Sequence, residues 1–238
     1  HQLRGNPTQA DLMADYVDIR DRTEALLLRS APDIAELALS LKPDLIVLGG
    51  DYVSFADRKF VGAVAELLAP LHAPHGVFAI LGNHDEEKDM APALARRGFR
   101  VLKDDRARVA LRGEALQLVG IRFWTRRPEQ IQPLVKNSGD SVILLAHDPR
   151  RLSEAAMFNV PGVLSGHTHG GQVVIPGIGA LAKARFPVLE GLGHKAYTSI
   201  FVSRGIGTVY VPVRINCPPE VALVTLTSVP RHGPPSDA

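Results

Sequence analysis

Apolar residues along the chain follow two alternating periods, one typical of helices and one typical of buried strands. Helical spacing appears at 34–41, after Pro32-Asp33 and before Pro43, and the short apolar run Leu45–Leu48 follows it. The same order repeats with a helix expected around 61–68, a strand at Val77–Leu81 and a helix from about Met90 to Arg97. This alternation predicts an α/β fold with a mainly parallel sheet flanked by helices.

The second half of the chain combines a hairpin with further buried runs. A turn at 112–114 separates Arg108–Leu111 from Leu116–Val119, which predicts two antiparallel strands. The run Val142–Ala146 predicts another buried strand, and a helix is expected near 151–158. Shorter β segments are expected at 172–175, 197–202, 208–211 and 221–226. We expect one domain over 1–230, with an atypical N-terminal region at 1–30 and a disordered tail at 231–238.

Composition narrows the choice of partners. The 238 residues are 45% hydrophobic and carry a net charge of +2, so the chain can bury a core without needing an anionic partner. No basic stripe is present, which counts against nucleic acid as a substrate. Cys217 is the single cysteine, so neither an internal disulfide nor a thiolate metal cage can form. No apolar run approaches the length of a membrane span.

Four clusters of metal-ligand residue types follow predicted strands. They are Gly49-Gly50-Asp51, Gly82-Asn83-His84-Asp85, Ala146-His147-Asp148-Pro149 and Gly166-His167-Thr168-His169-Gly170-Gly171-Gln172. Ligands of open α/β sheets gather beyond the carboxyl ends of the strands. We therefore expect the four clusters to build one site, in which neutral imidazole and oxygen atoms bind a metal.

Read singly, these residues have plainer explanations. Asp51 could form a turn or cap a helix, Asn83 could tolerate a left-handed backbone, and His147 could be a core imidazole. Arg204 and Arg214 fit structural ion pairs better than contacts with an anionic substrate. The two aromatic residues past the hairpin, Phe123 and Trp124, are expected to be packing residues.

The four clusters together resemble the calcineurin-like metallophosphoesterases. The continuation Val174–Gly179, Val202–Gly207 and Pro212–Glu220 resembles the bacterial branch that contains the YkuE- and YaeI-like phosphoesterases and certain UDP-diacylglucosamine hydrolases. The resemblance runs from about Pro43 to Leu226. It implies a four-layer α/β/β/α sandwich that holds two adjacent divalent metal ions.

The resemblance also implies a role for each matching residue. Asp51 would bridge both metals; Asn83, His147 and His167 would complete one site, and His169 would bind the other ion. His84 would protonate the leaving oxygen or hold a phosphoryl oxygen, oriented by Asp85 or a nearby carboxylate. The donor set suits Mn²⁺, Fe or Zn²⁺.

One departure from the family pattern weakens the second metal site. The family begins with a strand that ends in Asp-x-His, and this sequence contains no such motif. Asp11-Leu12-Met13, Asp15-Tyr16-Val17 and Asp18-Ile19-Arg20 are the candidate remnants, and none supplies a histidine. His1 as the last residue of a truncated motif is a further alternative. We expect one complete metal site and one incomplete site.

Three functions remain open at this point. The first is a metal-dependent phosphoesterase acting on a phosphodiester, a phosphomonoester or a lipid-linked pyrophosphate, with His84 as general acid. The second is a catalytically weakened homologue that serves as a binding scaffold, and the third is a nuclease, which the even charge balance disfavours. If the opening strand is missing, an exposed sheet edge would favour an oligomer. The sequence leaves the compartment open, with the cytoplasm or the membrane periphery as the expectation.

Overall fold

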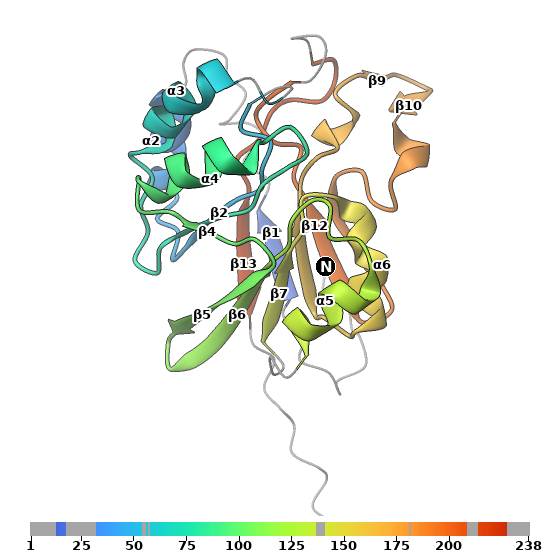
Figure 1. Ribbon diagram of the computed structural model, residues 1–238. Helices are drawn as coiled ribbons and strands as arrows, with labels where there is room; N and C mark the ends of the chain where they lie inside the picture. Colours follow the sequence, from blue (N-terminus) through green and yellow to red (C-terminus); the bar gives the residue numbers. More distant parts are fainter. Residues whose placement is uncertain are drawn as a thin grey trace, which may run out of the picture.

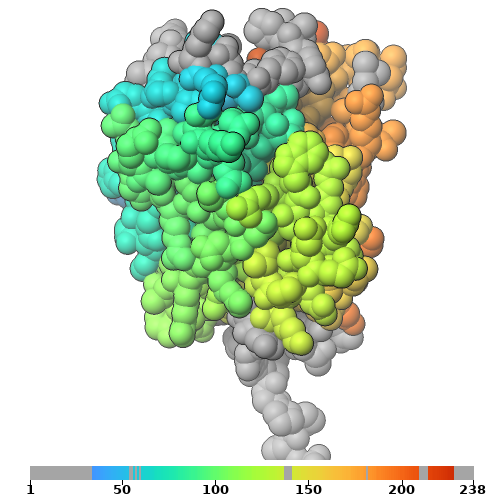
Figure 2. All heavy atoms as spheres, in the orientation of Figure 1, coloured from blue at the N-terminus to red at the C-terminus, as the bar shows by residue number. Residues whose placement is uncertain are grey.

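The structure is a computed structural model that describes residues 13–17, 32–53, 56, 58–136, 141–180, 182–208 and 214–227. Two β-sheets face one another, and each is covered by helices on its outer side (Figure 1). The space-filling view shows the segments of α3, α4, the β5–β6 hairpin and α5 packed side by side (Figure 2). The α/β sandwich that the family resemblance implied is thereby confirmed.

The smaller half of the sandwich consists of three helices packed on a three-stranded parallel sheet. Strand β3 lies in the middle of this sheet, between β2 and β4. The helices are α2 (Pro32–Ser40), α3 (Arg58–Leu68) and α4 (Glu87–Ala95), and the strands are β2 (Ile46–Leu48), β3 (Val77–Ala79) and β4 (Arg100–Val101).

The larger half is a six-stranded sheet with the order β11-β12-β8-β7-β6-β5. Its four central strands are parallel, and the two edge strands β5 and β11 are antiparallel to their neighbours. Two helices pack on its outer face: α5 (Pro128–Val135) and α6 (Leu152–Met157). The strands are β5 (Asp105–Leu111), β6 (Glu114–Gly120), β7 (Val142–Leu145), β8 (Gly162–Ser165), β11 (Gly191–Lys195) and β12 (Thr198–Val202).

Smaller elements complete the described part of the chain. Strand β1 (Met13–Val17) pairs antiparallel with β13 (Leu223–Thr227), and β9 (Val174–Ile175) pairs with β10 (Gly179–Ala180). Three short 3₁₀ helices are η1 (Pro149–Arg151), η2 (His169–Gly171) and η3 (Lys183–Arg185). Among the described residues no helix has the length and apolarity needed to cross a bilayer.

Strict alternation of apolar side chains along the strands builds the layers. In β7, Val142 and Leu144 face the α5 and α6 side, whereas Ile143 and Leu145 face the opposing sheet. Both sets are buried because the strand is covered on both faces, which explains why its sequence is one continuous apolar run. Strands β2 and β3 alternate in the same way between the α2–α4 layer and the space between the sheets.

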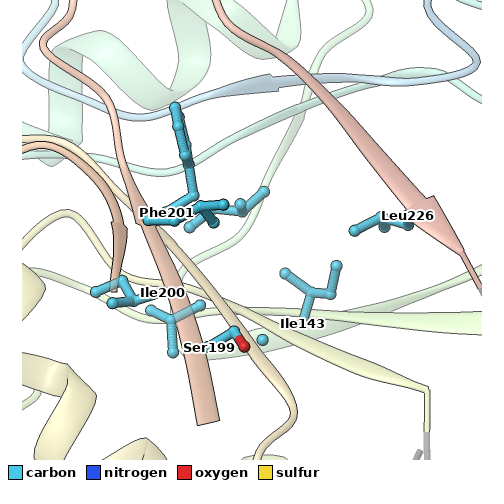
Figure 3. Close-up of a pocket in the computed structure, with 9 residues that line it drawn as sticks. Ile143, Ser199, Ile200, Phe201 and Leu226 are labelled. Carbon is cyan, nitrogen blue, oxygen red and sulfur yellow. The ribbon is translucent and has the colours of Figure 1, made fainter. Parts of the chain in front are cut away.

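A small apolar pocket remains between the sheets near β13. Leu226 lies across this pocket from Ile143, Ser199, Ile200 and Phe201 (Figure 3). The residues that line the pocket are almost all apolar. The pocket lies between packed layers of the fold, away from the strand ends that carry the metal-ligand residue types.

Most of the predicted elements are present. The helices at 34–41, 61–68 and 90–97, the hairpin and the strand at 142–146 are confirmed, with ends shifted by a few residues. The alternation alone did not separate one main sheet from two; the described residues form a three-stranded and a six-stranded sheet, besides two two-stranded sheets. Helix α5 and strands β1, β4, β10 and β11 were not predicted. The expected segment 208–211, most of the atypical region 1–30 and the tail 231–238 lie outside the described residues.

Two glycines provide a direct test of this packing. A Cβ at Gly120 in β6 would lie 2.3 Å from Leu102 Cβ and 3.0 Å from Ile80 Cγ2, whereas a Cβ at Gly62 in α3 would meet nothing within 4 Å. We expect Gly120→Ala to lower the free energy of unfolding by about 1–3 kcal/mol. Gly62→Ala should raise it by about 0.5–1 kcal/mol, because alanine restricts the unfolded chain. Urea unfolding of both variants measures this, and a Gly120→Ala variant as stable as the parent would contradict the close approach of the two sheets.

Candidate metal centre

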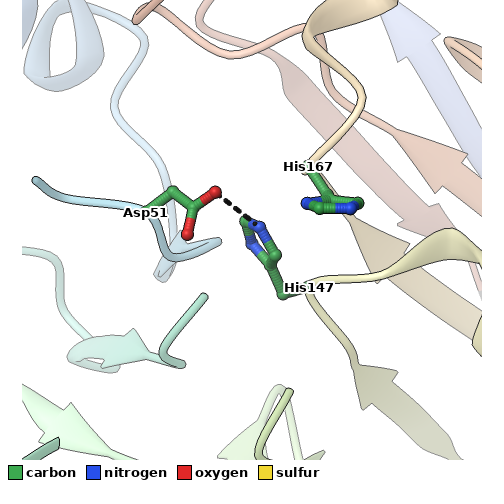
Figure 4. Close-up of side chains that lie close together, drawn as sticks. All are labelled: Asp51, His147 and His167. Carbon is green, nitrogen blue, oxygen red and sulfur yellow. Dashed lines mark hydrogen bonds and ion pairs between the residues drawn. The ribbon is translucent and has the colours of Figure 1, made fainter. Parts of the chain in front are cut away.

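Three side chains from separate strand ends converge on one point. Asp51 follows β2, His147 follows β7 and His167 follows β8 (Figure 4). One ligand atom from each lies within 4.8 Å of those of the other two, close enough for a single cation to contact all three. The convergence of these strand ends, expected from the order of the elements, is therefore present.

His147 is fixed in the orientation that a metal ligand needs. Its Nδ1 lies 2.7 Å from the Gly49 carbonyl oxygen, so this nitrogen donates its proton there. Its Nε2 lies 3.0 Å from Asp51 Oδ2. A histidine ligand commonly uses one ring nitrogen for such a second contact and the other for the metal. The plainer reading of His147 as an isolated core imidazole does not explain why Nε2 faces a carboxylate.

His167 is held among rings. Its ring centroid lies 4.9 Å from that of His147 and 5.5 Å from each of Phe123 and Phe186. Burial and, to a lesser extent, the charge of His147 lower the pKa of His167 to about 4, and the opposing charges of Asp148 and Asp51 do not offset them. The ring is therefore neutral at pH 7, which is the form that binds a metal.

The pair Asp51 and His147 is electrostatically coupled. Burial on its own raises the pKa of Asp51, but the hydrogen bond and charge of His147 outweigh burial and lower it. For His147, burial lowers the pKa, and the hydrogen bond and charge of Asp51 outweigh that effect and raise it. Asp51 consequently remains a carboxylate in a largely buried position, as a ligand to a divalent cation must.

The side-chain oxygen of Asn83 is a further candidate ligand. This atom, Oδ1, is buried and has no hydrogen-bond partner among the described residues. A buried amide oxygen left without a partner is unusual, because the cost of removing it from water is not offset. Two imidazoles, a carboxylate and an amide oxygen form a donor set that fits Mn²⁺, Fe or Zn²⁺. The residues present thus fit a divalent metal ion.

The neighbouring Asp85 organises the backbone around Asp51. Its carboxylate accepts hydrogen bonds from the backbone N–H groups of Gly82 at 2.8 Å, Asp51 at 2.7 Å and Tyr52 at 2.9 Å. The backbone N–H of His84 donates to Asp51 Oδ1 at 2.9 Å. Burial, with the charge of Asp51, raises the pKa of Asp85 against these three donors. Asp85 or a nearby carboxylate is expected from the sequence to orient His84, which stays a prediction; the anchoring of the two loops by Asp85 was not predicted.

Comparison with known proteins identifies this arrangement. A model of the calcineurin-like phosphoesterase family matches residues 11–171, which is more than half of the chain. The chain belongs to the calcineurin-like phosphoesterase family. Membership supports a metal-dependent hydrolase of phosphoric esters in general, and it explains why carboxylate, amide and imidazole ligands meet at the strand ends.

Three bacterial relatives confirm the YkuE- and YaeI-like branch. An uncharacterized metallophosphoesterase of Aquifex aeolicus is 35% identical over 78% of this chain and 73% of its own length. Phosphodiesterase YaeI of Escherichia coli is 33% identical over 82% of this chain and 74% of its own. The uncharacterized metallophosphoesterase YkuE of Bacillus subtilis is 30% identical over 79% of this chain and 69% of its own.

The second histidine of the family motif, His169, lies outside the three-ligand group and is held from behind. Its Nδ1 donates to the Gly207 carbonyl at 3.2 Å, which leaves Nε2 available. Arg214 donates to the same carbonyl at 2.6 Å and to the carbonyl of His169 at 3.0 Å. Both arginines, Arg204 and Arg214, were expected to form structural ion pairs. Arg204 pairs with Glu220 at 2.6 Å and with Glu190 at 3.6 Å, whereas Arg214 has no carboxylate partner among the described residues and donates to backbone carbonyl groups.

The three aspartates considered as remnants of an Asp-x-His motif lie before, on and after β1 in the sequence. Asp15 lies on β1, Asp18 follows the strand directly in sequence, and Asp11 precedes it. Asp11, Asp18 and His1 lie outside the described residues, so the fate of the second site's other ligands stays a prediction.

Phe123, Trp124 and Arg126 form an aromatic rim at the edge of the candidate metal centre. The ring of Phe123 is buried and lies 6.0 Å from His147 and 5.5 Å from His167, as centroid distances. Its neighbour Trp124 is 69% exposed, so its interpretation as a packing residue was wrong. The guanidinium carbon of Arg126 lies 5.0 Å from the Phe123 centroid and 4.7 Å from a Trp124 ring centroid.

The loop that carries this rim is tied to the body of the protein. Arg122 pairs with Glu87 at 2.8 Å and with Asp104 at 2.7 Å, and Thr125 Oγ1 donates to Asp104 at 2.9 Å. The hydrogen bonds and charges of Arg122 and Lys103 lower the pKa of Glu87 from 4.5 to about 2. Residues 122–125 are thereby linked to the N-terminal turn of α4.

The carboxylate of Asp51 lies so close to Gly82 that a side chain at position 82 would displace it, and we expect this to weaken metal binding. A Cβ at this position would lie 2.0 Å from Asp51 Oδ1, whereas a Cβ at Gly49 would meet nothing within 4 Å. We expect Mn²⁺ at 100 times its Kd to stabilise the parent by about 2.7 kcal/mol. Gly82→Ala should lose most of this stabilisation and Gly49→Ala should keep it. Thermal unfolding with and without Mn²⁺ measures the difference, and an unchanged response of Gly82→Ala would contradict the assignment of Asp51.

The ion pairs of Glu87 should make the stability depend on acid pH. Because the pKa of Glu87 falls on folding, from 4.5 to about 2, its pairing stabilises the protein above pH 4.5 and is lost as pH falls toward 2. Glu87→Gln should therefore be less stable than the parent at pH 7, and the gap should close at lower pH. Urea unfolding in chelator measures this. Glu66→Gln, which disrupts the exposed pair with Arg97, should change stability little; a pH-independent gap for Glu87→Gln would contradict the expectation.

Proposed function

We propose that this protein hydrolyses a phosphodiester, phosphomonoester or lipid-linked pyrophosphate, with a divalent metal ion held by Asp51, Asn83, His147 and His167. The observation that carries the proposal is the meeting of Asp51, His147 and His167; the unpartnered buried oxygen of Asn83, next in sequence to the His84 that contacts Asp51, supports it. Four ligands from four loops are enough to hold one ion firmly. The name of the Escherichia coli relative, phosphodiesterase YaeI, favours a diester as the first substrate to try.

The bound metal supplies charge, and the chain supplies geometry and a proton. When bound, divalent ions of this kind neutralise phosphoryl oxygens and lower the pKa of a coordinated water. His84 stands in the turn whose N–H contacts Asp51, so it is the residue we assign as general acid. Its imidazolium gives a proton to the leaving oxygen as the bond from phosphorus to that oxygen breaks. Asp85 keeps the turn in place through the backbone of Gly82 and Asp51.

We assign His169 and Asp51 to a second, weaker metal position. The sequence contains no Asp-x-His motif, and the further candidate ligands that it offers are the carboxylates near β1, of which Asp18 follows the strand directly. Fewer protein ligands give weaker binding, so one ion should remain after dialysis and a second should require excess metal. The alternative function, a binding scaffold with a remnant metal site, rests on this same deficiency.

The lipid-linked substrate has one observation in its favour. The β9–β10 hairpin exposes Ile175 and Ile178, with Ile178 74% exposed. This hairpin packs against η2, because a Cβ at Gly171 would lie 2.5 Å from Ala180 Cβ. Apolar side chains beside the metal loop suit the acyl part of a substrate or the periphery of a membrane.

Hydrolysis of bis(4-nitrophenyl) phosphate tests the proposal. We expect a rate that requires added Mn²⁺, Zn²⁺ or Fe²⁺ and disappears in chelator. His84→Ala should lower kcat about 100-fold or more, as loss of a general acid does. Asn83→Ala should raise the metal concentration needed for activity. His72→Ala, which removes an exposed imidazole remote in sequence from the four clusters, is the matched control and should leave the rate unchanged.

The outcomes separate the two functions. A metal-dependent rate that falls in His84→Ala and Asn83→Ala but not in His72→Ala supports the esterase. No rate above buffer with any of the three metals, while one ion still binds by elemental analysis, would overturn the esterase and leave the scaffold.

A further inference from the structure

Trp124 is an exposed aromatic side chain on an anchored loop at the edge of the metal centre. Its ring lies edge-on to Phe123, with centroids 4.8 Å apart and planes at 89°. Phe123 in turn borders His147 and His167. A large apolar ring that is 69% exposed loses the benefit of burial, so its position on a loop beside a reactive centre suggests contact with a ligand.

The loop is held in a fixed shape by polar contacts on both sides of Trp124. The backbone N–H of Arg122 donates to Asp104 Oδ1 at 3.0 Å, and its side chain donates to the Lys103 carbonyl at 3.1 Å. Thr125 is 5% exposed and its N–H donates to the Arg122 carbonyl at 3.0 Å. Arg151 donates to the Arg126 carbonyl at 3.0 Å. Side chains carried by such a loop are pre-organised, which lowers the entropic cost of binding.

Arg126 differs from the other arginine near the centre. Arg150 lies over Phe186 at 5.5 Å, but its charge is balanced by the buried carboxylate of Asp148 at 2.7 Å. Arg126 lies over Phe123 and Trp124 and forms an ion pair with no carboxylate in the described part of the chain. Ring faces orient a guanidinium without neutralising it, so its N–H donors keep their affinity for an anion.

We propose that Arg126 and Trp124 form a second binding subsite, which takes an anionic group of the substrate beyond the phosphoryl group that is cleaved. The guanidinium binds that second anion, a phosphoryl group or a carboxylate, and Trp124 packs against the carbon atoms that link it to the scissile group. One ring, Phe123, separates Arg126 from His167, so the two charges of the substrate sit on either side of that ring. The inference rests on the proposed function for the identity of the scissile group.

A series of matched chromogenic diesters tests the subsite. The probes are ethyl, 2-carboxyethyl and 2-phosphonoethyl 4-nitrophenyl phosphate, which share the leaving group and differ in the second anion. We expect kcat/KM of the parent to be about tenfold higher for at least one anionic ester than for the ethyl ester, as charge-assisted hydrogen bonds to a guanidinium allow. The carboxylate and phosphonate arms distinguish the two anion types.

Two variants assign the effect to the rim. Arg126→Gln should abolish the preference, so that kcat/KM for the anionic esters falls to that of the ethyl ester measured with the same variant. Arg108→Gln removes the same charge from the solvent face of β5 and should keep the preference. Equal kcat/KM for all three esters, or a preference that survives Arg126→Gln, would overturn the subsite without touching the proposed function.

A binding measurement decides the question if no ester is hydrolysed. Trp124 is the single tryptophan of the chain, so intrinsic tryptophan fluorescence reports directly on this subsite. Titration with 2-phosphonoethyl methyl phosphate should give a saturable change that ethyl methyl phosphate does not give and that Arg126→Gln lacks. That result supports the subsite even where absent hydrolysis overturns the esterase. A fluorescence signal that neither ligand changes would overturn the subsite.

Discussion

The structure of the centre depends on the carboxylate of Asp85. By accepting hydrogen bonds from the N–H groups of Gly82, Asp51 and Tyr52, it joins the loops that follow β2 and β3. Each of these donors would otherwise be buried without a partner, at a cost of about 1–3 kcal/mol each. The hydroxyl of Tyr52 adds a second link between the same strands, because it donates at 2.9 Å to the carbonyl of Ile80. Asp51 is thereby held facing His147 across the gap between the two sheets.

This arrangement is maintained against local backbone strain. Asp51, His167 and His169 have φ values of 58°, 70° and 53°, a region that residues other than glycine rarely adopt. Glycine adopts such φ values freely, but it would remove the side chains that the proposed metal positions require. The strain is therefore offset by contacts outside the centre, among them those of Asp85 with the Asp51 loop and of Arg214 with the His169 carbonyl. Such strain is typical of functional sites.

Much of this could be predicted from the sequence, and the failures have physical causes. Buried strands covered on both faces, such as Val142–Leu145, leave an unmistakable apolar run. Strand β11 leaves no such signal, because it is an edge strand with glycine at 191 and 193. Helix α5 contains Pro128 and Pro133 and buries only Ile131, so its apolar periodicity is weak.

The side-chain roles that were missed involve partners that a sequence pattern does not display. Arg214 binds carbonyl oxygens, which every residue carries, so no charged neighbour in the sequence announces its role. The exposure of Trp124 depends on the direction in which the loop after β6 leaves the sheet, and the ion pairs of Arg122 fix that direction. The candidate ligands at the strand ends were predictable because the atoms that bind a metal belong to their side chains, and side chains are what a sequence shows.

The two proposed metal positions differ in how the fold supports their residues. Asn83, His147 and His167 follow β3, β7 and β8, each of which has a paired strand on both sides, whereas Asp51 follows the edge strand β2 and is held by the hydrogen bonds that Asp85 accepts. His169 instead stands on η2, a single 3₁₀ turn whose alignment depends on hydrogen bonds to Gly207, Arg214 and Cys217. Hydrogen bonds in a partly exposed loop constrain a ligand less than packing does, since water competes for them. The proposed position of Asn83, His147 and His167 therefore has the more rigid support, and the proposed second position depends on the alignment of the His169 turn.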